Sequence, residues 1–173
     1  MFLPPRTLRR LFGTRAHTVP PDRLRGLDAL CATRLAVRPI LESTRQYVFL
    51  HLREVAHRHD LHVAPEVSLG AVFTVDADGS EAGAEAIRAL RRKRVDFLLI
   101  DGKANAVLAV DCRPGEAPSG RPMRDPIKRR AFEKARLPFL ELAGGRTIAD
   151  DMARVEAMLR TRAEEPAADR RAA

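Results

Sequence analysis

Two aspartates lie at the ends of neighbouring apolar segments. Residues 95–101 and 106–113 are typical of two β-strands joined by a short turn that contains Gly102. Asp96 lies at the start of the first segment and Asp111 near the end of the second. Aspartate is depleted in strands, so two of them bracketing a hairpin need a reason. Strands that place acids at neighbouring ends can hold a divalent cation such as Mg²⁺ between them.

The elements that must position these aspartates alternate between helices and strands. In chain order, the pattern predicts a helix at 41–59, one or two strands at 61–73, a short helix or basic turn within 81–94, the two strands above, a helix at 125–136, a strand at 139–142 and a helix from 147 to about 162. Pro65 predicts an edge position for the first strand, and Asp125 followed by Pro126 predicts a helix start. This order predicts an α/β fold with a mixed central sheet flanked by helices.

Three regions are expected along the chain. Residues 1–37 form a basic N-terminal arm with a short helix that starts at Pro20 and Pro21. Residues 38–162 form the folded domain, and residues 163–173 are a polar tail without core-forming residues, which we expect to be disordered.

Several segments occur in the order found in a known bacterial family. They are the helix at 41–56 and the segments at 64–69, 92–97, 109–111, 124–128 and 135–140. Together they resemble the domain of unknown function 2726 (DUF2726) family over about residues 38–145. That family is usually assigned to the restriction-endonuclease-like, or PD-(D/E)XK, nucleases. The resemblance therefore implies a restriction-endonuclease-like mixed central sheet flanked by helices.

The resemblance also implies roles for the residues of the hairpin. Asp96 and Asp111 would bind Mg²⁺, and the carbonyl of Cys112 would be a further metal ligand for phosphodiester hydrolysis. Arg113 takes the position of the motif lysine, but arginine stays protonated and therefore suits phosphate binding better than proton transfer. Lys128, on the helix that begins at Asp125, is an alternative source of that lysine.

Purely structural roles are the alternatives for the same residues. Asp96 would cap a strand end or pair with Arg92 or Arg94, and Asp111 would pair with Arg113 or Arg124. Cys112, within an apolar strand, is expected to be a small buried residue.

The sequence departs from the family pattern at three places. Arg45 stands where the family has a glutamate in its first helix, and Asp111-Cys112-Arg113-Pro114 stands where the family has Glu-Leu-Asp-Asp. The expected histidine falls near Ala117. Glu66 and Glu42 are candidate substitutes for a missing acid, but a surface or edge residue is the favoured interpretation for each.

Composition favours a polyanionic partner. The chain of 173 residues carries a formal charge of +8 with a pI near 10.6, and only four of its 31 basic residues are lysine. A basic, arginine-rich surface attracts phosphates, although a GC-rich genome also explains the arginines. With two cysteines and no long apolar run, we expect a cytoplasmic bacterial protein that binds nucleic acid, with DNA as the expected form, and no membrane.

Three functions follow from these observations. The first is a nucleic-acid-binding, restriction-endonuclease-like domain that includes Mg²⁺-dependent nuclease activity. The alternative is a catalytically degenerate relative that acts as a nucleic-acid-binding or protein-interaction scaffold, which Arg45 and Arg113 favour. A third is a module whose arginines contact an acidic protein partner.

Overall fold

The computed structural model describes residues 21–76, 78–113, 125–142 and 146–164. The chain divides into two units, residues 1–38 and residues 39–173. The first contains helix α1 (Pro21–Cys31), whose Leu27 and Leu30 side chains are exposed. The predicted basic arm before Pro20 and most of the predicted disordered tail lie outside the described residues.

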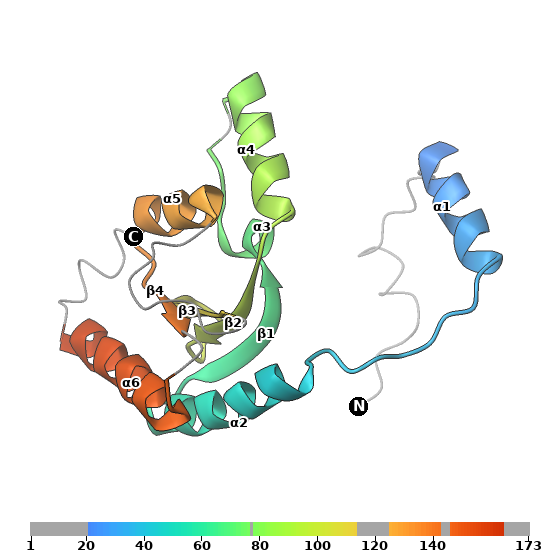
Figure 1. Cartoon of the computed structure of the whole chain (residues 1–173). Helices are drawn as coiled ribbons and strands as arrows, with labels where there is room; N and C mark the ends of the chain where they lie inside the picture. The colour runs from blue at the N-terminus through green and yellow to red at the C-terminus, as the bar shows by residue number, and fades with distance from the viewer. Residues whose placement is uncertain (1–20, 77, 114–124, 143–145, 165–173) are drawn as a thin grey trace, which may run out of the picture. The chain divides into compact units, whose positions relative to one another are not determined.

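The second unit is a mixed α/β fold around one sheet. Its helices are α2 (Ser43–Arg58), α3 (Leu69–Val72), α4 (Glu81–Arg91), α5 (Pro126–Lys134) and α6 (Ile148–Glu164). Its strands are β1 (His62–Ser68), β2 (Arg94–Ile100), β3 (Ala106–Cys112) and β4 (Phe139–Leu142). They lie in the order β1-β2-β3-β4, in which β1 pairs antiparallel with β2, β2 pairs antiparallel with β3, and β3 pairs parallel with β4 (Figure 1). The prediction of a mixed sheet flanked by helices is therefore confirmed.

Each face of the sheet buries a separate apolar cluster. Residues of α2 and α6 pack against one face, where Phe97, Leu99, Leu108 and Val110 are almost completely buried. Residues of α3, α4 and α5 pack against the other face around Leu98. Figure 1 shows the same arrangement, with α2 and α6 on one side of the strands and α4 and α5 on the other. A strand buried on both faces needs the continuous apolar run that β2 has after Asp96.

Strand β1 is an edge strand, as Pro65 predicted. It pairs only with β2, so the missing N–H of Pro65 removes no hydrogen bond to a second strand. Glu66 follows with a left-handed φ of 54°, and the register passes from Pro65 to Val67 without a Cα partner at Glu66. The pairs on either side place Glu66 opposite Asp96 of β2.

The structure confirms the helical alternative within 81–94 and differs from the prediction at residues 69–72 and at the end of the last helix. Residues 61–73 form one strand followed by the short helix α3, because the Ser68 side chain accepts a hydrogen bond from Gly70 N and so caps a helical turn. The basic segment within 81–94 is a regular helix up to Arg91, capped by the Ser80 side chain, which accepts from Gly83 N. The final helix extends to Glu164, two residues beyond its predicted end.

Candidate functional site

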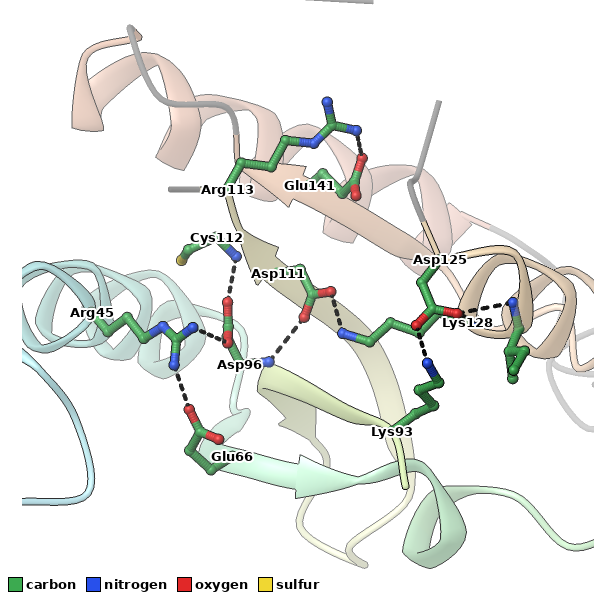
Figure 2. Close-up of polar contacts among 11 residues, drawn as sticks. Arg45, Glu66, Lys93, Asp96, Asp111, Cys112, Arg113, Asp125, Lys128 and Glu141 are labelled. Carbon is green, nitrogen blue, oxygen red and sulfur yellow. Dashed lines mark hydrogen bonds and ion pairs between the residues drawn. The ribbon is translucent and has the colours of Figure 1, made fainter. Parts of the chain in front are cut away.

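Asp96 and Asp111 are held together at the point where the β2–β3 ladder ends. Phe97 and Val110 are the last partners in register on this side. Beyond them, Asp111 Oδ1 accepts a hydrogen bond from Asp96 N at 3.0 Å, and Asp96 Oδ2 accepts one from Cys112 N at 2.7 Å (Figure 2). The two carboxylates therefore satisfy backbone N–H groups that the ladder no longer pairs. The strand-end role considered for Asp96 is present in this geometry.

The two carboxylates connect to helices on opposite faces of the sheet. Asp96 pairs with Arg45 of α2, and Asp111 pairs with Lys128 of α5. Phe97 also faces α2, so the inside-outside alternation of β2 shifts by one residue at Asp96. The structure thus brings Asp96, Asp111 and Lys128 to one strand end, and adds Arg45.

Arg45 bridges two carboxylates from neighbouring strands. Its Nη1 lies 2.8 Å from Glu66 Oε1, and its Nη2 lies 3.2 Å from Asp96 Oδ1. The Asp96 side chain is 13% exposed, whereas that of Arg45 is 39% exposed. Arg45 lies in the first turn of α2, and the left-handed backbone at Glu66 accompanies the carboxylate that meets it. Glu42, the other acid considered, precedes α2 and makes no side-chain capping hydrogen bond.

Lys128 and Lys93 hold the start of α5 against the strand ends. Lys128 Nζ lies 2.7 Å from Asp111 Oδ2, and Lys93 Nζ lies 2.7 Å from Asp125 Oδ2. Asp125 also caps α5, because its Oδ1 accepts from Ile127 N and from Lys128 N. Pro126 occupies the first helical turn, so the predicted start of this helix is confirmed.

Arg113 pairs with Glu141, away from the two aspartates (Figure 2). Glu141 is the register partner of Asp111 in the parallel β3–β4 pair, and its carbonyl also accepts from Arg154 Nη1 at 3.2 Å. The predicted ion pair between Asp111 and Arg113 is therefore wrong, since Asp111 pairs with Lys128 instead. Arg124, the other predicted partner, lies outside the described residues.

The comparisons with known proteins identify a family without an assigned function. Residues 37–159 match the family described as "Protein of unknown function (DUF2726)". The chain belongs to the DUF2726 family. A protein of Haemophilus influenzae described as "Uncharacterized protein" is 28% identical over 118 residues, which are 66% of this chain and 59% of that relative. The match therefore spans less than two thirds of the relative's length. No solved structure matches the chain.

The environment of this DUF2726 site moves three pKa values away from their ordinary ranges. Burial raises the pKa of Asp96, and the hydrogen bond from Cys112 N opposes that rise. Burial also raises the pKa of the half-buried Cys112 thiol, which packs against the apolar cluster under α2 and α6, to about 12. Burial acts to raise the pKa of Asp125 as well, but the hydrogen bonds from Lys93 and from the Lys128 and Ile127 amides outweigh it and lower that pKa.

The residues in this arrangement do not fit a Mg²⁺ ion between Asp96 and Asp111. Each of their four carboxylate oxygens already contacts a nitrogen donor, and two of these donors are the cationic groups of Arg45 and Lys128. Within the described ranges, no group of three or more His, Cys, Asp or Glu side chains could hold a metal ion. A divalent ion between the two aspartates would be repelled by both of these cations. The predicted Mg²⁺ and the Cys112 carbonyl ligand therefore stay predictions.

Sequence reasoning missed four members of this network. The residues not predicted for the site are Lys93, Arg45 as a bridging cation, Asp125 as an ion-pair partner, and Glu141. The signal for Glu141 was available, because parallel strands bring their carboxyl ends together, and Glu141 ends β4 much as Asp111 ends β3. The left-handed turn that presents Glu66 to Arg45 has no equivalent signal in the residue pattern.

Proposed function

We propose that the second unit of this DUF2726 protein is a restriction-endonuclease-like domain that binds the phosphate backbone of nucleic acid and does not hydrolyse it. The order of α2, the antiparallel strands β1, β2 and β3, α5 and the parallel strand β4, with α3 and α4 inserted between β1 and β2, supports the fold assignment. The carrying observation is that Arg45 and Lys128 neutralise Asp96 and Asp111.

Neutralisation of these aspartates matters because a phosphate backbone is repelled by uncompensated carboxylates. Arg45 and Lys128 supply two positive charges that offset two of the three carboxylate charges of Glu66, Asp96 and Asp111, which reduces the repulsion of a phosphate at this point. The same contacts occupy the oxygens that would otherwise bind a metal and so activate water. The geometry supports binding more than hydrolysis.

The surface beside these residues is strongly basic. We define the β2 basic segment as Arg91, Arg92 and Arg94, which end α4 and begin β2. All three are exposed, and within the described ranges no carboxylate forms an ion pair with them. Lys93, between them in the chain, reaches Asp125 at the start of α5. Exposed, uncompensated arginines next to a neutralised carboxylate pair favour contact with phosphates.

No helix within the described ranges combines the length and apolar character needed to cross a membrane. The basic segment is instead the feature from which we propose a nucleic-acid partner. Duplex contacts to phosphate depend steeply on salt, so binding should weaken as salt rises.

A binding assay with paired variants tests the proposal. Fluorescence anisotropy with a labelled 20-base-pair duplex should show saturable binding that is weaker in Arg92→Ala/Arg94→Ala. The control Arg53→Ala/Arg160→Ala removes two exposed arginines from α2 and α6 and should bind like the wild type. Equal losses in both pairs would mean that the β2 basic segment is not the binding surface.

Incubation with supercoiled plasmid and Mg²⁺ or Mn²⁺ tests the second half of the proposal. We expect no metal-dependent nicking. Lys128 Nζ, at 2.7 Å from Asp111 Oδ2, is a feature that favours hydrolysis, because it supplies the lysine that Arg113 does not. Nicking that requires metal and disappears in Asp96→Ala/Asp111→Ala would overturn the non-hydrolytic assignment and establish a phosphodiesterase.

A further inference from the structure

The Arg45 guanidinium lies where a cation between two carboxylates would lie. Its two terminal nitrogens contact different acids, Glu66 at 2.8 Å and Asp96 at 3.2 Å, and those acids come from adjacent strands. A planar fork that reaches two carboxylates at once is the geometry for which arginine is suited. Figure 2 shows the Arg45 guanidinium with one contact to the Asp96 carboxylate and another to the Glu66 carboxylate.

Glu66 and Asp96 each orient one carboxylate oxygen toward the Arg45 guanidinium. Glu66 adopts φ 54°, a conformation that costs a non-glycine residue free energy and that persists only where its surroundings favour it. Asp96 keeps one oxygen on Cys112 N and turns the other toward Arg45. Both acid side chains are less exposed than the arginine that joins them. Without a cation at this point, two partly buried carboxylates would repel each other.

We infer that Arg45 is a built-in replacement for a divalent cation: it links Glu66 to Asp96, keeps metal ions out of the wild-type protein, and leaves a divalent-cation site when it is removed. The inference concerns this carboxylate pair alone and does not require nucleic-acid binding.

Mn²⁺ binding to purified full-length protein tests the inference. In isothermal titration, Arg45→Gln should bind Mn²⁺ about tenfold or more tightly than the wild type, because it removes a unit charge next to two carboxylates. The wild type should show no Mn²⁺ binding that depends on Asp96. Thermal unfolding should show that Mn²⁺ raises the Tm of Arg45→Gln and leaves the Tm of the wild type unchanged.

Two matched variants separate this effect from general metal binding. Arg53→Gln changes another arginine of α2, which lies 5.8 Å from the Phe49 ring centroid, and should gain no Mn²⁺ affinity. Arg45→Gln/Asp96→Asn should lose the affinity that Arg45→Gln gains. Arg45→Lys keeps the charge and should resemble the wild type in Mn²⁺ affinity.

Three results would overturn the inference. The first is Asp96-dependent Mn²⁺ binding by the wild type, because Arg45 would then exclude nothing. The second is a folded Arg45→Gln protein with wild-type Mn²⁺ affinity. The third is an Arg45→Gln protein that stays unfolded at saturating Mn²⁺, because the metal could not then replace the guanidinium. A protein that fails to bind DNA but gains Mn²⁺ affinity in Arg45→Gln would refute the proposed function and support this inference.

Discussion

At the scale of single residues, the site is a set of carboxylates that each have a specific donor. Asp96 and Asp111 hold the ends of β2 and β3 through backbone N–H groups, and Arg45 and Lys128 supply the opposite charge. Charged hydrogen bonds that are partly shielded from water contribute more than exposed ion pairs. The stability of the strand end should therefore depend on these side chains individually.

Replacing Lys128 tests this dependence. Lys128→Ala should lower the free energy of unfolding by about 1.5–3 kcal/mol, because it leaves Asp111 Oδ2 without its cationic donor in a site where both side chains are mostly buried. Urea denaturation measures the change. Lys134→Ala removes an exposed lysine from the same helix and should cost no more than about 0.5 kcal/mol. Equal effects of the two substitutions would mean that the Asp111 contact contributes nothing.

The pKa of Asp96 predicts a pH dependence of stability. Burial raises this pKa in the folded protein, so the folded state keeps the proton to a higher pH than the unfolded state. The contribution of Asp96 to the free energy of unfolding should therefore fall as pH rises from about 3.9, the ordinary value, through the raised folded-state pKa.

Urea denaturation across this pH range compares the wild type with Asp96→Asn, in which the side chain at position 96 does not titrate. The free energy of unfolding of the wild type should decrease relative to that of the variant as pH rises, and the difference should level off near neutrality. An increase relative to the variant would show that the folded-state pKa of Asp96 is lowered, contrary to the effect of burial.

Among the helices and strands, the sequence pattern predicted those whose formation depends on local signals. The β2–β3 hairpin follows from two apolar runs around a glycine turn, and α5 follows from Asp125 and Pro126. Helix α3 was missed because it is a single turn whose cap, Ser68, lies within an apparent strand. The left-handed residue Glu66 was missed because no glycine or asparagine marks the position.

Gly70 is required by the contact between α3 and α4. A Cβ at this position would lie 2.8 Å from Arg91 Cγ and 3.2 Å from Arg91 Cα, so one of the two helices would have to move. Gly70→Ala should lower the free energy of unfolding by about 1–3 kcal/mol. At Gly102 an added Cβ meets nothing within 4 Å, so Gly102→Ala should change the free energy of unfolding by no more than about 0.5 kcal/mol. Thermal or urea unfolding that ranks Gly102→Ala as the more harmful would contradict the close contact.

Asp125 joins the start of α5 to β2. Asp125→Ala removes both the cap and the Lys93 ion pair, and should cost about 1–2 kcal/mol of unfolding free energy in urea denaturation at neutral pH. Since the folded-state pKa of Asp125 is lowered, its contribution is complete above the ordinary aspartate pKa and is lost as pH falls through the lowered value. Asp125→Asn should recover part of the loss, because asparagine also caps helices. A variant as stable as the wild type at neutral pH would contradict this role.

At the scale of the whole molecule, charge and architecture were more predictable than the contacts of the site. The mixed sheet, its edge strand and its two apolar faces follow from periodicity and turn residues. The pairing of Arg45 with two acids, and of Lys128 with Asp111, depends on how α2 and α5 pack on opposite faces. Such contacts join residues far apart in the chain, so a local pattern carries no signal for them.

We propose that this domain binds a nucleic-acid backbone without a metal. The most direct test is the affinity of a fluorescent duplex DNA for the full chain in EDTA, measured over a series of salt concentrations. We expect saturable binding, and the logarithm of the association constant should fall linearly with the logarithm of the salt concentration. The Arg92→Ala/Arg94→Ala variant should make this slope shallower by about one to two units. Binding that requires Mg²⁺, or that is absent at low salt in a folded protein, would contradict it.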